Sequence, residues 1–234
     1  MGRCRIIGGH FDTVLTNLLF RSKLANLVTL DLFYLDLKYL SLEILIDNLI
    51  SLQELYLDQV NISVSPTDLA HASSTNTTSG LTKLSMGQCA ITGGRFYTVL
   101  TNLLLRSKLV NLVTLELSGL DLKNLSLHAL IDSLGSVQRL YLEQVNISVS
   151  PKDWVHLAST NTMSGLKELT MWQCTITGVR LDTALTTIPL LSNLVMLDLS
   201  GPGLDPQNNL SLGTLTDNLG SLQKLYLYSF NISS

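Results

Sequence analysis

The chain contains nearly three copies of one sequence block, and this duplication constrains the fold more than any other feature. The segment CRIIGGHFDTVLTNLLFRSKLANLVTL, which begins at Cys4, returns 85 residues later at Cys89 as CAITGGRFYTVLTNLLLRSKLVNLVTL. A third copy begins at Cys174, diverges after Thr177 and resembles the other two again from Leu210. Blocks 4–88, 89–173 and 174–234 therefore predict a single array, spanning residues 1–234, of stacked and structurally equivalent units.

Each block contains a shorter pattern, Leu-x-x-Leu-x-x-Leu-x-Leu, whose final two leucines would point to one side of a short strand. The pattern recurs every 25 to 31 residues, which overlaps the upper end of the ~20–29 residues of a leucine-rich repeat. It predicts eight strands, centred on Leu30/Leu32, Leu55/Leu57, Leu84/Met86, Leu115/Leu117, Leu140/Leu142, Leu169/Met171, Leu197/Leu199 and Leu225/Leu227.

A coil of this size cannot bury its apolar side alone, so successive coils must stack. The predicted fold is α/β: a leucine-rich-repeat solenoid, or horseshoe, of about eight repeats, with a parallel concave β-sheet and a helical or irregular convex side. The segment TVLTNLLLRSKLVNL from Thr98 spaces its leucines at helical intervals, and 65–68 and 150–153 carry helix-start signals of Ser-Pro followed by Asp.

Charge and hydrophobicity argue against nucleic-acid binding, a membrane-spanning helix and a signal peptide. A formal net charge of −3 provides no basic surface for nucleic acid. Every run of leucines is interrupted well before the ~18 apolar residues of a membrane-spanning helix, so no transmembrane segment is predicted. The first ten residues, MGRCRIIGGH, lack the apolar stretch of a signal peptide.

The residues with reactive side chains are explained by the repeat. Cys4, Cys89 and Cys174 share one position, just after a predicted strand, and lie three coils apart, too far for a disulfide or a shared metal. We therefore expect small buried groups that pack or bond to the turn backbone. His71 and His156 are also one repeated position, each three residues after an aspartate on a predicted helix, so we expect a structural partner there, and no two histidines lie three or four residues apart. No catalytic motif is present, so the chain is predicted not to be an enzyme and to need no cofactor or metal.

Both ends of the chain coincide with the interior of a repeat. Met1 precedes Met86 by 85 residues, and Asn231 to Ser233 correspond to Asn146 to Ser148. We therefore expect a fragment of a longer array, uncapped at both ends, because a solenoid normally covers its terminal apolar faces. The alternative is a short gene product whose open ends pair with another chain.

Residues between the strand leucines should form two columns on the concave face. One column contains Asp31, Tyr56, Ser85, Glu116, Tyr141, Thr170, Asp198 and Tyr226. The other contains Phe33, Asp58, Gly87, Ser118, Glu143, Trp172, Ser200 and Tyr228. The eleven aromatic and acidic members are the candidate ligand-binding residues, suited to a peptide or protein with basic and apolar groups. The alternative is that strands favour tyrosine for structural reasons.

Six Asn-x-Ser/Thr sequons mark candidate glycosylation sites. They begin at Asn61, Asn76, Asn124, Asn146, Asn209 and Asn231. Three of these, Asn61, Asn146 and Asn231, are one position in the three copies, so they are fewer independent observations than their number suggests.

The segments LYLDQVNIS, LYLEQVNIS, LSMGQCAITG and LVNLVTLELSGLDL resemble the extracellular repeats of plant leucine-rich-repeat receptor-like proteins, in particular the disease-resistance branch that includes Verticillium-wilt resistance proteins. The likeness covers essentially the whole chain, although the family's Leu-Ser-Gly-x-Ile-Pro motif is missing. It implies a parent protein on the outer side of the plasma membrane, with N-glycans, a protein or peptide ligand on the concave face and a co-receptor kinase, acting in defence or developmental signalling. The alternative function is an intracellular scaffold or a truncated, non-functional gene product.

Overall fold

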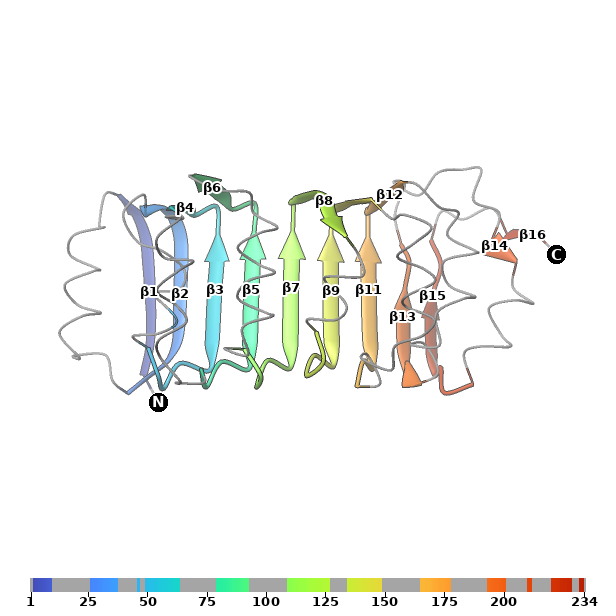
Figure 1. Cartoon of the computed structure of the whole chain (residues 1–234), viewed down its shortest axis with the longest axis horizontal. Coiled ribbons are helices and arrows are strands. Elements are labelled where there is room, and N and C mark those ends of the chain that lie inside the picture. The colour runs from blue at the N-terminus through green and yellow to red at the C-terminus, as the bar shows by residue number, and fades with distance from the viewer. Residues whose placement is uncertain are drawn as a thin grey trace. The chain divides into compact units, whose positions relative to one another are not determined.

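The computed structural model describes residues 2–9, 26–37, 46, 49–63, 79–92, 109–126, 134–148, 165–177, 193–200, 210–211, 220–228 and 232–233. The chain divides into two compact units, Met1–Val113 (unit 1) and Thr114–Ser234 (unit 2). Figure 1 shows that the long strands of each unit run side by side in one direction.

Unit 1 is built on four parallel strands. β1 (Gly2–Gly9) pairs with β2 (Leu27–Leu37), β2 with β3 (Glu54–Asp58), and β3 with β5 (Lys83–Gly87). A second, shorter layer follows the turn at the end of these strands. In it, β4 (Asn61–Ser63) lies between the last residues of β2 and β6 (Ala90–Thr92).

Unit 2 repeats this arrangement. Its parallel strands are, in spatial order, β7 (Thr114–Ser118), β9 (Arg139–Glu143), β11 (Glu168–Trp172), β13 (Met196–Asp198) and β15 (Lys224–Tyr226). The short layer contains β8 (Asp121–Ser126), β10 (Asn146–Ser148) and β12 (Thr175–Thr177), and a separate pair joins β14 (Leu210–Ser211) to β16 (Ile232–Ser233).

The core of each unit is made by the repeated leucines. Leu30 and Leu55 in unit 1, like Leu115 and Leu140 in unit 2, are buried and lie opposite each other in register across neighbouring strands. Burying one such side chain contributes about 1.5–3 kcal/mol, so stacking identical leucines selects the parallel register. Each predicted leucine pair lies within a strand or begins in one, which confirms the parallel-strand solenoid within each unit.

Within the described residues, six of the coils have a residue with a left-handed backbone directly after the residue of the second predicted column. The backbone angle φ of this residue lies between 48° and 62°. The six residues are Tyr34, Gln59, Gln88, Gly119, Gln144 and Gln173. Its N–H donates to the next coil: Gln59 to the carbonyl of Gly87 at 2.7 Å, and Gln144 to that of Trp172 at 2.8 Å. The turn therefore holds neighbouring coils together where the long strands end.

The first strand departs from the predicted register. The repeat predicts Met1 beside Leu32 and Cys4 beyond the strand, but β1 places Ile6 beside Leu32 and Cys4 beside Leu30. In this position β1 pairs with β2 from Gly2 to Gly9, whereas the repeat register would leave only its first residues paired. The additional backbone hydrogen bonds favour the observed register.

The predicted helices lie almost entirely outside the described residues, including 65–68, 98–108 and 150–153, and residues 109–111 form a turn. In the described part, short strands supply the second layer. None of the described residues forms a helix with the length and hydrophobicity needed to cross a bilayer. The single-array boundaries stay a prediction.

Candidate functional site

The face of each sheet that carries no leucines is the candidate binding surface, and we call it the open face. In unit 1 the register places Asp31 beside Tyr56 and Phe33 beside Asp58. In unit 2 the register places Trp172 beside Glu143. It also aligns the five first-column residues of that unit from strand to strand: Glu116, Tyr141, Thr170, Asp198 and Tyr226. Tyr228 lies two residues beyond the end of β15. The predicted columns therefore exist within each unit; their role in binding stays a prediction.

A third column shares the open face and was missed from the sequence. Its members, each two residues before a first-column residue, are Thr29, Glu54 and Lys83 in unit 1 and Thr114, Arg139, Glu168, Met196 and Lys224 in unit 2. The available signal was the two-residue alternation of a strand, extended to the residue before the first strand leucine. This column brings the basic side chains to the face.

In unit 1, Glu54 organises the middle of the open face. Its Oε2 accepts a hydrogen bond from the Thr29 hydroxyl at 3.2 Å and from the Tyr56 hydroxyl at 3.4 Å. On the other side of Tyr56, the Lys83 Nζ lies 5.1 Å from the centre of its ring, within the range of a cation–π contact. Tyr56 is therefore held between an acid and a base.

Asp58 lies over a glycine. A Cβ atom at Gly87 would be only 2.6 Å from Oδ1 of Asp58, so the carboxylate occupies space that a side chain at Gly87 would need. Desolvation raises the pKa of Asp58, the charge of Asp31 raises it further, and a hydrogen bond from the Gln59 backbone opposes both. This part of the unit 1 face is therefore acidic, and the Asp58 carboxylate covers Gly87.

In unit 2 the equivalent tyrosine has a different acidic partner. Tyr141 corresponds to Tyr56 in the duplication, and its hydroxyl donates to Oε2 of Glu168 on the next strand at 2.6 Å. Desolvation raises the pKa of Tyr141 to about 12, with further contributions from the hydrogen bond and the charge of Glu168. The flanking charges are reversed between copies, because Arg139 replaces Glu54 and Glu168 replaces Lys83.

We expect Tyr141 to ionise near pH 12, and we expect its contribution to the free energy of unfolding to decrease at alkaline pH. A phenol with a raised pKa in the folded state stabilises fully below its ordinary pKa of 10, and this contribution is lost as pH rises toward 12. Near-ultraviolet absorbance titration of the chain and of Tyr141→Phe gives the pKa by difference, which is necessary because the chain has seven tyrosines. Glu168→Gln should lower this pKa, and an unchanged value would contradict the role of Glu168.

Unit 2 also presents the most exposed large apolar side chains of the candidate set. Trp172 is 40% exposed, Tyr226 39% and Tyr228 65%. The Glu143 carboxylate beside Trp172 is exposed as well, whereas Asp198 accepts a hydrogen bond from the hydroxyl of Ser200. Exposed aromatic rings are the side chains most often central to protein interfaces.

The two cysteines with described side chains are free thiols that bond to the backbone. Cys89 donates to the carbonyls of Leu57 and Gly87, both at 3.5 Å, and Cys174 donates to that of Leu142 at 3.3 Å. Burial raises the pKa of each thiol to about 11. These contacts confirm the predicted structural role for these two residues. The histidines lie outside the described residues, and within the described part no three potential ligands gather into a metal-binding group.

Two sequons are placed with their side chains. Asn61 and Asn146 lie half-exposed in β4 and β10, where the following isoleucine is buried. Asn124 lies in β8, and Asn76, Asn209 and Asn231 fall outside the described residues. The placed asparagines are thus on the short layer and not on the open face.

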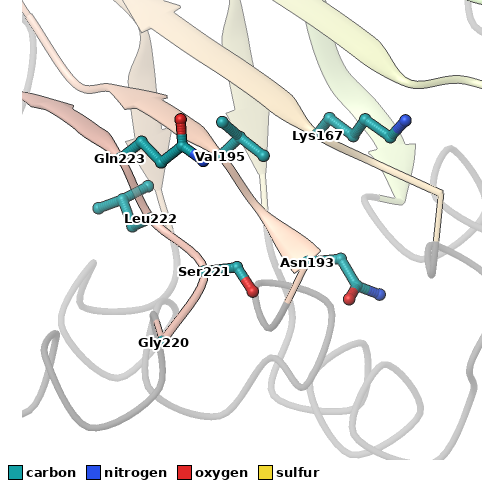
Figure 2. A pocket seen from close by; sticks show the side chains of 7 residues that line it. All are labelled: Lys167, Asn193, Val195, Gly220, Ser221, Leu222 and Gln223. Atoms are coloured by element: carbon teal, nitrogen blue, oxygen red, sulfur yellow. The ribbon is translucent and has the colours of Figure 1, made fainter.

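An open hollow lies in unit 2 at the opposite ends of the strands, before β11, β13 and β15 (Figure 2). It is lined by Lys167, Asn193, Val195, Gly220, Ser221, Leu222 and Gln223. The backbone N–H groups of the three residues that precede these strands all donate to carbonyls of the preceding coil. Figure 2 shows the Lys167 side chain extending away from Leu222 and Gln223. Lys167 is the one charged side chain among these described lining residues.

Comparison with known proteins gives no sequence match and a partial structural similarity. No known protein-family profile matches the chain, and no curated protein is similar to it in sequence. A solved leucine-rich-repeat protein of Leptospira interrogans is similar with a TM-score of 0.48 and 19% identity. The match covers 91% of this chain and 52% of that one, so the chain spans about half the length of the bacterial protein. The repeat architecture stands on the strands and register described above.

Proposed function

We propose that this chain is a non-catalytic module that recognises a protein or peptide ligand through the open face. The observation that supports this proposal is the pattern of sequence differences between the first and second copies of the repeated block. Residues 26–37, 49–63 and 80–92 can be compared with 111–122, 134–148 and 165–177, because both sets are described and lie 85 residues apart.

The differences concentrate on the open face. Of its nine positions in these segments, seven differ between the copies, whereas only five of the other 31 positions differ. Several are radical: Phe33 becomes Ser118, and Gly87 becomes Trp172. Exposure alone does not explain this, because of the six exposed positions outside the face in these unit 1 segments, three are identical to their counterparts: Asn26, Gln53 and Gln88. A surface that diverges while its scaffold is retained favours recognition of different ligand groups by the two copies.

We further propose that the parent is a plant leucine-rich-repeat receptor-like protein, with this region outside the cell and a co-receptor kinase as signalling partner in defence or development. The sequence resemblance supports this role. The half-exposed Asn61 and Asn146 are compatible with it, since glycans there would leave the open face accessible. Secreted expression should add glycan mass that a peptide glycosidase removes, and an unmodified secreted product would contradict the glycoprotein assignment.

The recognition role is tested by selecting binders from a random-peptide display library with the secreted chain. We expect enriched peptides whose affinity falls at least about tenfold when Trp172 and Tyr226 are both replaced by alanine, because aromatic interface centres commonly contribute more than ~1–2 kcal/mol. Lys167→Ala is the matched control, exposed in unit 2 but outside the open face. No enrichment, or equal losses in the control, would overturn the proposed surface.

A further inference from the structure

We propose that Glu143 and Trp172 form a subsite for an arginine side chain of the ligand. This inference rests on the proposed recognition function and identifies the chemistry of one part of the open face. Glu143 and Trp172 are register partners on the neighbouring parallel strands β9 and β11, so their backbones lie about 4.8 Å apart. Both side chains emerge on the same face of the sheet.

Access to the pair is open on both sides. Trp172 is 40% exposed and Glu143 is exposed. The register partner of Glu143 on β7 is Ser118, and the residue beside Trp172 on the other side is Ser200, whose carbonyl accepts the neighbouring Gln173 N–H at 2.9 Å. Two small side chains therefore flank the carboxylate and the indole, which leaves room for a planar group to lie against the ring.

Among the described residues, Glu143 also differs from the other acids of the unit 2 face, whose side chains have interaction partners there. Glu168 accepts from Tyr141, and Asp198 accepts from Ser200. Within the described residues no hydrogen bond or ion pair engages the Glu143 carboxylate. A carboxylate left without a partner beside an exposed ring is complementary to a cation that can both stack and donate hydrogen bonds.

The arginine guanidinium fits this pair better than an ammonium group. It is planar, stacks on indole with a cation–π contribution, and presents paired N–H donors that match the two oxygens of a carboxylate. A lysine could satisfy the charge but not the stacking. The predicted ligand segment therefore carries an arginine where it crosses β9 and β11.

The first copy provides a natural control. Asp58 and Gly87 occupy the positions that Glu143 and Trp172 occupy in the second copy. Asp58 is the shorter acid, receives a hydrogen bond from the Gln59 backbone and lies over a residue without a ring. The subsite is therefore specific to unit 2, and exchange of these residues tests it in both directions.

The probe is a short acetylated peptide with one central arginine flanked by leucines. Binding is followed by the indole N–H resonance of Trp172, in a Trp154→Phe background that removes the second tryptophan. We expect the arginine peptide to shift this resonance. We expect the same peptide with citrulline, the neutral isostere, to bind about five- to tenfold more weakly, and the lysine peptide to fall between them.

Glu143→Gln should weaken the arginine peptide by a similar factor and leave the citrulline peptide unchanged. Trp172→Gly, read by isothermal calorimetry, should remove the preference for arginine. In that background, Phe33→Ser, Asp58→Glu and Gly87→Trp together should restore it in unit 1. The acid is changed because the Asp58 carboxylate occupies the space above Gly87, and Phe33 is changed because Ser118 holds the equivalent position beside Glu143. Restored preference supports the subsite.

Equal binding of the arginine and citrulline peptides, or no effect of Glu143→Gln, would overturn the arginine assignment. If Trp172→Gly still weakened both peptides, the open face would remain a recognition surface of apolar preference, and only this inference would fail. Absence of any shift with the arginine peptide would also overturn the subsite, while the display selection decides the recognition function separately.

Discussion

Replacing Leu115 by alanine is expected to destabilise the chain by about 2–5 kcal/mol. Leu115 is 0% exposed, and its register partner Leu140 is also buried. Removing the isobutyl group forfeits its transfer free energy and leaves a cavity, because the neighbouring β9 coil is fixed by its backbone hydrogen bonds and cannot close onto it. Urea unfolding monitored by circular dichroism would measure the change.

The matched control is Leu225→Ala. Leu225 occupies the same position in β15 that Leu115 occupies in β7, yet it is 38% exposed. A cavity cannot form where solvent already reaches the side chain, so we expect a loss below about 1 kcal/mol. Equal losses at the two positions would show that the leucines do not stabilise the unit through burial.

Replacing Gln144 by valine is expected to cost about 1–2 kcal/mol, and replacing it by glycine is expected to be neutral or to stabilise by up to about 1 kcal/mol. Gln144 has a φ of 53°, where a β-branched side chain collides with its own backbone. The backbone bond from its N–H to the Trp172 carbonyl at 2.8 Å holds this conformation in every variant. The glycine variant loses only the exposed side-chain bond to Gln173.

Gln138 provides the control for this turn. It lies just before β9, and its carbonyl accepts hydrogen bonds from Lys167 and Glu168, but its φ is not positive. Glycine there should destabilise through the entropy of the unfolded chain, and valine should be tolerated. The two glutamines are expected to respond oppositely to glycine in thermal unfolding. The same response at both sites would show that turn strain does not contribute.

Much of the candidate site could be predicted from sequence because a strand alternates strictly. Once the leucines are assigned to the core, the residues between them must share the other face, and equal coils bring equal positions into register. This reasoning placed Tyr56 beside Asp31, and Trp172 beside Glu143. It should also have reached the third column, in which Glu54 and Arg139 are the charge-exchanged counterparts.

Other features depend on interactions that no local pattern encodes. The left-handed turn is occupied mostly by glutamine, so the glycine that usually signals a positive φ is found only at Gly119 among these positions. The conformation is imposed by a hydrogen bond to the next coil. The register of β1 is likewise set by how much of β2 it can pair with, which the repeat did not predict.

By itself, the sequence determined the eight leucine-bearing strands, their parallel stacking within each unit, the leucine core and the side of the sheet that each intervening residue occupies. All of these follow from periodicity, and periodicity is a property of the chain alone. The tertiary structure decided which of the described carboxylates accept side-chain hydrogen bonds, how Asp58 lies over Gly87, and in which register β1 pairs with β2. These depend on distances between residues some 25–30 positions apart, which are set only when neighbouring coils pack against each other.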